Sequence, residues 1–370
     1  MSTLAPRDPD PLEEVLDGPV LPTQLPQGTY VDRFLLVSKI KEDATGVLYR
    51  GFDPDAEQRV FVKLIPIPWL GNSKDPISRK SLLDEAQIIS QLKHPLIAAV
   101  QQVGEVEKDL FIVTQMPPGK SLREWLGDRN QSHQQILAVF LAIGRALCAA
   151  HRAGVYHRVF SPDSVYVDED SQVHLFNFQP ASGAGVKKHP SGAQPIVPKE
   201  NQTMDTWPGL AKSLQESSDD TLRSEDGNRF VTQRTSQGLS LGVPSYMAPE
   251  QHLGMSADAS SDQFSFCVSL YEALYGRRPY SAKTLTNLKL EVLQGKFLSP
   301  PIDSRTPARI WPVLIKGLSV APADRFPAME ALLKELEHIV SARTRTLLTA
   351  GFIAAALGLA AIAAYLSRSM

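Results

Sequence analysis

The sequence predicts an α+β protein built from two lobes, a small antiparallel β-sheet lobe with one helix and a larger helical lobe. Three observations predict this. Short apolar runs of strand length dominate residues 30–114, and apolar residues at helical spacing dominate from residue 121 onward. The third observation is the uncharged apolar stretch 346–366, which predicts one C-terminal transmembrane helix after the two lobes.

Composition excludes several classes of protein. The chain has 370 residues, a formal net charge of −2 and 43% hydrophobic residues, so it is neither wholly disordered nor basic enough to predict a nucleic-acid partner. Its two cysteines, Cys148 and Cys267, do not suffice for a disulfide framework or a zinc cluster. The eight histidines lack metal-ligand spacing to Cys, Asp or Glu, so no metal site is predicted.

The strand and helix predictions follow from local patterns. In the first lobe, apolar runs predict four strands and one amphipathic helix, and in the second lobe helical periodicity predicts three long helices. The predicted strands are 33–40, 46–53, 59–67 and 109–116; the predicted helices are 78–92, 135–154, 261–276 and 328–340.

Shifts in composition predict the domain boundaries. A Pro- and acid-rich start reads as a disordered leader without a signal peptide, and a long polar stretch interrupts the helical lobe without apolar periodicity. The predicted parts are a leader over 1–28, a two-lobed domain over 29–342 (lobes 29–116 and 117–342) with a disordered insert over 180–241, a span over 346–366 and a tail over 367–370.

The C-terminal stretch 346–366 is long enough to cross a bilayer core of roughly 30 Å. Arg343 and Arg345 precede it and Tyr365 lies near its far end, which predicts a basic cytoplasmic flank and an aromatic residue at the opposite interface. We therefore expect a single-pass protein of the inner cell membrane with its two-lobed domain in the cytoplasm. The alternative is a helix buried in the soluble domain.

Five motifs occur in order over residues 30–340: RVFVKLI, SLLDEAQII, YHRVFSPDSVYVDED, VHLFNFQPA and GVPSYMAPEQ. Their order and spacing resemble the bacterial Ser/Thr (Hanks-type) protein kinase family. RVFVKLI resembles the strand that carries the family's lysine, here Lys63, and SLLDEAQII resembles the helix with its glutamate partner, here Glu85. YHRVFSPDSVYVDED resembles the catalytic loop, VHLFNFQPA the metal-binding motif, and GVPSYMAPEQ the end of the activation segment. The resemblance further implies that Asp262 supports the catalytic loop and that Glu250 pairs with Arg325.

The resemblance fails where phosphoryl transfer takes place. Transfer depends on the placement of charges around the phosphates, the metal ions and the acceptor hydroxyl. A valine cannot accept the hydroxyl proton, and a neutral amide is a weaker magnesium ligand than a carboxylate. The positions of the family's catalytic aspartate, phosphate lysine, metal asparagine and metal aspartate hold Val159, Ser161, Ser164 and Asn177. The nearby Asp163, Asp168 and Asp170 are interpreted as turn and surface carboxylates.

The nucleotide pocket also departs from the family. In the segment that matches the glycine-rich phosphate loop, residues 41–46, only Gly46 remains. Because side chains alternate along a strand, Phe61 shares the cleft face with Lys63, at a position where the family has a small residue. Tyr166 stands where the opposite wall usually has leucine. We expect both rings to fill the adenine slot; the alternative is that they rotate aside and leave a usable pocket.

Other matched positions are structural. Thr114 would guard the back of the pocket, Lys63 and Glu85 would pair without nucleotide, and Arg158 could bind a phosphate on the insert 180–241, whose alternative role is a plain linker. Four apolar or aromatic positions would form the stack between the lobes. They are Ile89, Val100, His157 and Phe178.

These residues predict a membrane-tethered pseudokinase that acts as a signalling scaffold or regulatory module. It would need no cofactor, would bind protein partners and the bilayer, and would not bind nucleic acid. Two alternatives remain. One is an active but unconventional Ser/Thr kinase that uses ATP and magnesium, supported by Lys63, Glu85 and Arg158. The other is a sensor that binds ATP without hydrolysing it.

Overall fold

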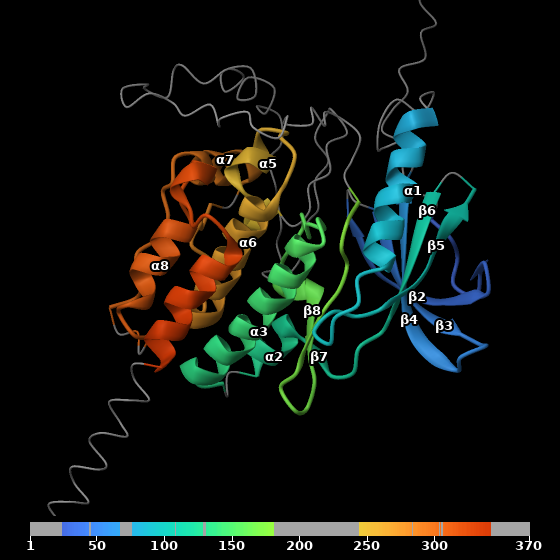
Figure 1. Cartoon of the computed structure of the whole chain (residues 1–370), viewed down its shortest axis with the longest axis horizontal. Helices are drawn as coiled ribbons and strands as arrows, with labels where there is room; N and C mark the ends of the chain where they lie inside the picture. The colour runs from blue at the N-terminus through green and yellow to red at the C-terminus, as the bar shows by residue number, and fades with distance from the viewer. Residues whose placement is uncertain are drawn as a thin grey trace, which may run out of the picture.

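Two lobes lie next to each other in the computed structural model, which describes residues 24–43, 46–66, 76–107, 109–128, 131–180, 244–282, 284–302, 304 and 306–341. The N-lobe is a β-sheet with one helix, and the C-lobe is mainly helical (Figure 1). The predicted α+β architecture with two lobes is therefore confirmed.

The N-lobe sheet has six antiparallel strands in the order β1-β2-β3-β4-β6-β5. Its central strands are rich in Val, Ile, Leu and Phe, which suit a sheet that is buried on both faces. The sequence missed β1 and β5, of which β5 is half-buried and carries several polar residues. The strands are β1 Tyr30–Val31, β2 Phe34–Asp43, β3 Gly46–Asp53, β4 Gln58–Pro66, β5 Val100–Val106 and β6 Asp109–Gln115.

One helix, α1 (Pro76–Ser90), packs on the sheet near β5. Proline suits the first turn of a helix because the backbone N–H that it lacks has no helical partner there. Leu82 and Ala86 of α1 pack against Ile65 and Leu110 of the sheet. This packing fixes the helix that carries Glu85 and Ile89 beside the cleft.

The C-lobe contains the predicted long helices and a small sheet of order β7-β8-β9. Its core forms around α3 and α6, which contact each other. The helices are α2 Leu122–Gly127, α3 His133–Arg152, α5 Pro249–His252, α6 Ala259–Tyr275, α7 Leu285–Leu293, α8 Ile310–Gly317 and a last helix over 329–341. The strands are β7 Lys120–Ser121, β8 Val165–Val167 and β9 Val173–Leu175.

Capping residues set the ends of the two central helices. The Ser132 side chain accepts a hydrogen bond from Gln135 N at the start of α3, and the Asp258 carboxylate accepts from Ser260 N and Ser261 N at the start of α6. Gly276 ends α6 with φ 67°, a left-handed conformation that glycine adopts without strain. Both helices thus hold fixed positions behind the cleft.

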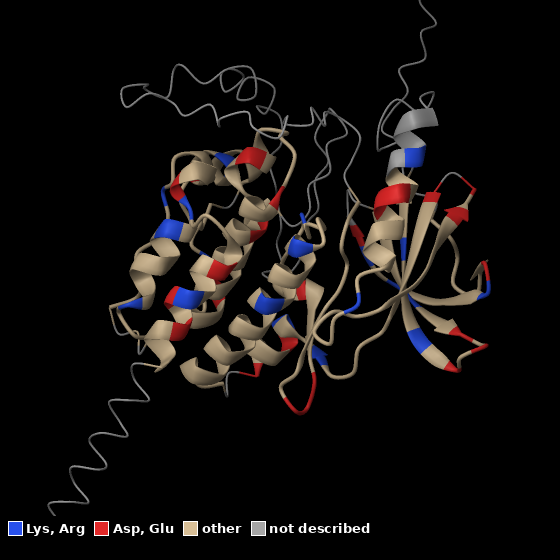
Figure 2. Cartoon of the chain, viewed as in Figure 1, with Lys and Arg blue, Asp and Glu red and all other residues tan. Residues whose placement is uncertain are grey.

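Among the described helices, α3 has a length and composition that would permit a membrane span, but 61% of its apolar window is buried within the protein, as in a core helix. The predicted span 346–366 and most of the predicted insert lie outside the described residues and stay predictions. Basic and acidic residues are both scattered over the C-lobe helices (Figure 2), in keeping with the small net charge.

The predicted leader 1–28 was too long, because its last residues belong to the N-lobe. Gly28 N donates to Leu36 O (2.9 Å) and Leu36 N donates to Thr29 O (2.9 Å), so the chain already pairs with β2 there. Leu25 packs against the apolar cluster on one face of the sheet. This segment has too few apolar residues to predict a strand from the sequence. Leu25 and the backbone of residues 28 and 29 nevertheless hold it against the sheet.

Candidate interlobe site

The carboxylate of Asp262 in α6 supports the loop that follows α3. Asp262, buried in α6, accepts hydrogen bonds from His157 N (2.7 Å) and Arg158 N (2.7 Å), and its Oδ2 lies 2.8 Å from His151 Nε2. The sequence predicted this support by Asp262, and the structure confirms it. His151 was not predicted as a further partner. The carboxylate fixes the backbone of residues 157 and 158 whatever the side chains that follow.

His157 lies in the core under this loop. It is fully buried, and its Nε2 lies 2.9 Å from Phe176 O. Burial lowers the pKa of His157, although Asp262 opposes the shift, so the imidazole is neutral at physiological pH. Its ring centroid lies 4.8 Å from that of Phe178. Phe178 and Ile89 belong to one apolar cluster, and the half-buried Val100 packs against it. This packing agrees with the predicted stack between the lobes.

Arg158 links the catalytic-loop segment to the N-lobe. Its backbone is left-handed (φ 68°), its Nη1 donates to Gln179 O at 2.6 Å, and the same nitrogen lies 3.4 Å from Glu85 Oε2 on α1. An ion pair between Glu85 and Arg158 was not predicted. The expected pair between Glu85 and Lys63 stays a prediction.

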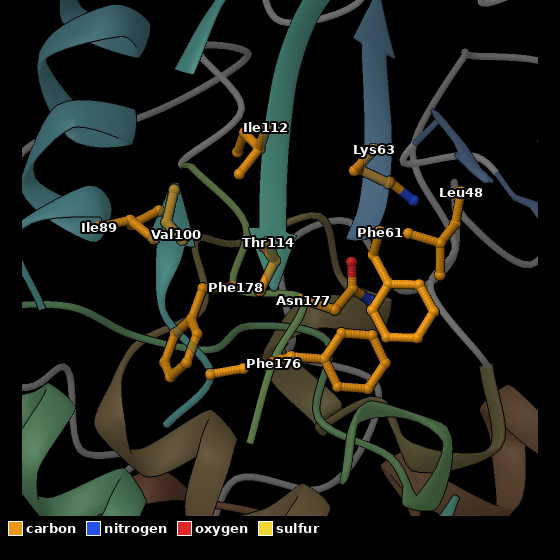
Figure 3. Close-up of a pocket in the computed structure, with 11 residues that line it drawn as sticks. Leu48, Phe61, Lys63, Ile89, Val100, Ile112, Thr114, Phe176, Asn177 and Phe178 are labelled. Carbon is orange, nitrogen blue, oxygen red and sulfur yellow. The ribbon is translucent and has the colours of Figure 1, made fainter. Parts of the chain in front are cut away.

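Lys63 lies in β4 and is 5% exposed. It pairs in register with Leu48 of β3 and Ile112 of β6, in the middle of the sheet. In Figure 3 its amino group points toward the side of Leu48, opposite the side on which Ile89 lies. Thr114, 6% exposed, lines a small cavity between the lobes together with Lys63, as predicted.

Three aromatic rings fill the space between the lobes, and we name Phe61, Tyr166 and Phe176 the aromatic seam. Phe61 stacks on Phe176 with centroids 4.8 Å apart and ring planes 18° apart. Tyr166 completes the group at 5.7 Å from Phe61 and 5.6 Å from Phe176. Leu48 packs against them, and all four side chains are buried. The prediction that Phe61 and Tyr166 fill the slot is supported by this geometry.

The seam includes a residue and a hydrogen bond that sequence reasoning missed. Phe176, 2% exposed, provides the ring that stacks directly on Phe61. Its signal in the sequence was a large ring directly before Asn177, next to a position that the resemblance assigns to a metal ligand. Arg50 of β3 hydrogen-bonds the Tyr166 hydroxyl, and burial raises the pKa of Tyr166. The phenol is therefore neutral and adds a polar link between the lobes.

A cavity lies beside the seam, and Figure 3 shows the side chains that line it. Its volume is ≈ 10 Å³, measured as space for the centres of water molecules, which is room for about one water. Apart from Lys63, Thr114 and Asn177, its lining is apolar. A purine ring needs many times this space, so the residues present do not fit a bound nucleotide in this conformation.

The four replaced positions are held by the loop's own hydrogen bonds. Ser161 and Ser164 are 3% and 2% exposed; Ser161 O accepts from Ser164 N (2.9 Å), and Ser164 O accepts from Phe176 N (3.0 Å). Val159 N donates to His157 O at 2.8 Å. Asn177, in a left-handed conformation with φ 64°, accepts a hydrogen bond from Gln179 Nε2 at 3.2 Å.

Asn177 stands where the family resemblance implies a metal ligand. Within the described ranges, no group of three or more His, Cys, Asp or Glu side chains is arranged to hold a metal ion. Magnesium prefers charged oxygen ligands, and the amide of Asn177 offers a neutral one. Within the described residues, the amide of Asn177 is thus a weaker magnesium ligand than a carboxylate at that position would be.

Asp163 and Asp168, which were predicted to be turn or surface carboxylates, both have hydrogen-bond partners within the protein. Asp163 receives two hydrogen bonds from the Arg123 guanidinium, at 2.6 and 3.0 Å, and Arg123 was not predicted. Asp168 accepts from Asp170 N (3.1 Å) and Gln172 N (2.7 Å) in the β8–β9 turn. Hydrogen bonding to His174 and to this turn lowers the pKa of Asp168 against the effect of burial.

The predicted pair between Glu250 and Arg325 is confirmed. Arg325 Nη1 and Nη2 lie 2.8 Å from the two Glu250 carboxylate oxygens, and both side chains are buried. Ser261 Oγ donates to the same carboxylate at 2.7 Å. The guanidinium also donates to backbone carbonyls, including Ser319 O at 2.9 Å. This pair ties the end of the matched activation segment to the C-lobe.

Gly46, the first residue of β3, lies very close to the backbone of Leu64 in the neighbouring strand β4. Its φ of 127° belongs to glycine, and a Cβ there would meet Leu64 O at 1.9 Å. Gly46 is thus required by the hairpin itself and needs no phosphate to explain it. Glu42, four residues earlier, adds a negative charge at the end of β2.

The fold and the site geometry define a chain with the architecture of a protein kinase. The family model described as "Protein kinase domain" matches residues 35–194, and the model described as "Protein tyrosine and serine/threonine kinase" matches residues 220–336. Together the matches cover most of the chain. The chain belongs to the protein kinase family, and its relatives place it among the bacterial Ser/Thr (Hanks-type) members.

Two curated relatives illustrate this placement. The tyrosine-protein kinase MasK of Myxococcus xanthus is 28% identical over 344 residues, which cover 88% of this chain and 45% of MasK. The serine/threonine-protein kinase PknL of Mycobacterium tuberculosis is 26% identical over 310 residues, which cover 83% of this chain and 65% of PknL. The chain therefore spans about half to two thirds of the length of these relatives.

A solved structure supports the fold. The crystal structure of the Mycobacterium tuberculosis PknI kinase domain superposes with a TM-score of 0.55 at 20% identity, covering 86% of this chain and 100% of that domain. At this identity the likeness concerns the fold alone.

Proposed function

We propose that this chain is a membrane-anchored pseudokinase that works as a signalling scaffold or regulatory interaction module, with little or no phosphoryl transfer and without nucleotide or metal. The observation that carries the proposal is the aromatic seam. Three rings lie between the lobes, and the remaining cavity has room for about one water (≈ 10 Å³). The replaced positions Val159, Ser161, Ser164 and Asn177 support it independently, because they remove the proton acceptor and the phosphate and metal contacts.

The seam also supplies a reason for the fold to persist without a ligand. Aromatic pairs at such distances are worth about 0.5–1.5 kcal/mol beyond their burial. The ion pair between Glu85 and Arg158 and the hydrogen bond between Arg50 and Tyr166 add two polar links across the cleft. The lobes are thus joined by side chains where a nucleotide would otherwise join them, which suits a surface that protein partners recognise in one fixed shape.

The test is a thermal-shift titration of the full chain in detergent with ATP and either magnesium or manganese. We expect no stabilisation at millimolar nucleotide, because a ligand stabilises the folded state only through binding. An active bacterial protein kinase under the same conditions is the positive control. Stabilisation by several degrees at micromolar ATP would contradict the proposal.

An unconventional, ATP-dependent Ser/Thr kinase is the second candidate. Lys63 supports it, because the lysine keeps its place in β4 and lines the cavity beside Asn177. The curated relatives named as kinases favour it as well. Incubation with radiolabelled ATP separates the two proposals: incorporation that Lys63→Met abolishes supports the kinase, and a non-hydrolysing sensor would bind ATP in the titration but incorporate nothing.

The membrane anchor rests on the uncharged stretch 346–366 and on the preceding Arg343 and Arg345. In the proposal they hold the domain on the cytoplasmic face of the inner membrane. A chain that ends at residue 342 should move from the membrane fraction to the soluble fraction. Replacement of the two arginines by glutamine is the matched control for loss of charge alone and should leave the chain in the membrane fraction.

A further inference from the structure

Residues 24–29, which we name the N-terminal strap, reach from the start of β1 to the β2–β3 turn. The Gln24 side-chain amide donates to both carboxylate oxygens of Glu42, at 2.9 Å each. Lys39 Nζ lies 3.2 Å from the same carboxylate. The strap and the strand thus meet at Glu42, 18 residues away from Gln24 in sequence.

A second contact fixes the strap to the strand after the turn. Leu25 N donates to the Tyr49 hydroxyl at 3.1 Å, and the Leu25 side chain packs against the sheet cluster that contains Tyr49. Tyr49 is 2% exposed and lies in β3, opposite Lys39 of β2. The strap therefore holds both strands of the hairpin, one through Glu42 and the other through Tyr49.

The same hairpin forms one wall of the interlobe site. Leu48, the residue before Tyr49, packs with Phe61, Tyr166 and Phe176. In register, Leu48 lies opposite Lys41, one residue before Glu42. Side chains alternate along the strand, so Tyr49 faces the strap while Leu48 faces the aromatic seam. A change in the strap thus reaches the seam through two adjacent residues.

We propose that the N-terminal strap is a regulatory clasp within the N-lobe: when docked, it holds the β2–β3 hairpin and Leu48 against the aromatic seam, and when it detaches, the hairpin is released. This inference rests on the proposed function, because it makes the seam the regulated element. The contacts of the strap at Glu42 are solvent-exposed, so this end of the strap can open locally while the backbone pairing of residues 28 and 29 with Leu36 persists.

The test is hydrogen exchange of the full chain in detergent, with the amides of residues 41–49 as readout. Gln24→Glu places a second carboxylate against Glu42 and should raise the exchange rates of these amides about fivefold. Gln27→Glu makes the same charge change in the strap at an exposed residue and should leave them unchanged. Amides in α3 and α6 report global stability and should not respond to either variant.

A swap of the two groups makes the test specific. In Gln24→Glu combined with Glu42→Gln, the amide and the carboxylate exchange places, so slow exchange at residues 41–49 should return. Equal exchange in the parent, Gln24→Glu and the swapped variant would overturn the clasp. Rapid exchange in Gln24→Glu and also in the swapped variant would overturn the clasp too. It would mean that the contact between residues 24 and 42 does not hold the hairpin.

The outcome can be separated from that of the proposed function. ATP binding by the parent chain would contradict the pseudokinase, whatever the exchange rates are. An unchanged hairpin in Gln24→Glu together with a parent that does not bind ATP would overturn the clasp and leave the pseudokinase standing.

Discussion

The loop over residues 157–164 faces the C-lobe core on one side and the interlobe cleft on the other, and the two sides are built differently. On the core side, Asp262 accepts two backbone hydrogen bonds. In the same lobe, both carboxylate oxygens of Glu250 accept hydrogen bonds from Arg325. On the cleft side, Val159 and Asn177 stand where the family resemblance implies charged residues. The charge that supports the loop is thus present in the structure, whereas the proposed function holds that the charges that would act on phosphate are replaced.

This difference shows that the loop's shape does not depend on the reaction. Arg158 and Asn177 keep left-handed backbones with φ of 68° and 64°, which cost free energy and persist because surrounding contacts impose them. Those contacts come from Asp262, Phe176 O and Gln179 O, all of which belong to the protein itself. A chain can thus retain the architecture of the site while its cleft is filled with side chains.

The largest effect is expected on the core side. Arg325→Ala removes the partner of a buried carboxylate and should lower the free energy of unfolding by about 3–5 kcal/mol. Arg145→Ala is the matched control, because Arg145 pairs with Glu337 at 2.7 Å but both side chains are about half exposed (59% and 46%), and its loss should cost at most about 1 kcal/mol. Urea unfolding measures both. Equal losses would mean that the buried pair does not support the C-lobe.

The next effect tests the cleft side. Phe61→Ala removes the central ring of the aromatic seam and should cost about 3 kcal/mol, because the cavity cannot fully collapse. Phe61→Leu keeps most of the volume and should cost clearly less. Urea unfolding again gives the values. A loss below about 1 kcal/mol for Phe61→Ala would show that the seam does not join the lobes.

Sequence reasoning predicted the parts that depend on side chains of one kind at fixed spacing. Strands β3, β4 and β6, the central helices, Asp262 and the pair of Glu250 with Arg325 all follow from local pattern or from matched motifs. The strand β5 was missed because its polar residues at 101, 102 and 105 weaken the apolar signal, while pairing with β6 decides its conformation.

Contacts between distant segments could not be predicted. Phe176 joins the seam because Asn177 turns the chain through a left-handed conformation, which no alternation rule anticipates. Arg158 contacts Glu85, which lies 73 residues earlier in the sequence, only because the lobes close over the loop. The strap docks through a tyrosine hydroxyl and one carboxylate, and neither has a signature in sequence.

A smaller effect is expected from acid on the core side. Burial, reinforced by the Lys289 ammonium, lowers the pKa of His252 to about 4, while the carbonyl of Pro244 and the Glu250 carboxylate oppose the shift. In the unfolded chain His252 titrates near its ordinary pKa of about 6.5. Between these values the unfolded state binds more protons than the folded state, so stability falls as the pH decreases from about 6.5 to 4.

The loss should be on the order of 2–3 kcal/mol at pH 4 and absent above pH 7. Urea unfolding as a function of pH measures it, with His252→Phe as the variant in which this part of the slope should vanish. A slope that persists unchanged in His252→Phe would assign the acid sensitivity to other groups, such as the buried His157, whose pKa is also lowered by burial.

The smallest expected effect separates the two changes on the cleft side. The variant Val159→Asp, Ser161→Lys, Ser164→Asn, Asn177→Asp restores the matched charges but leaves the aromatic seam in place. We expect no thermal shift with magnesium and ATP, because the cavity still has room for about one water. Adding Phe61→Ala and Tyr166→Leu opens the slot and should then give a shift. Stabilisation by ATP in the first variant alone would mean that lost charge, and not filled space, keeps the nucleotide out.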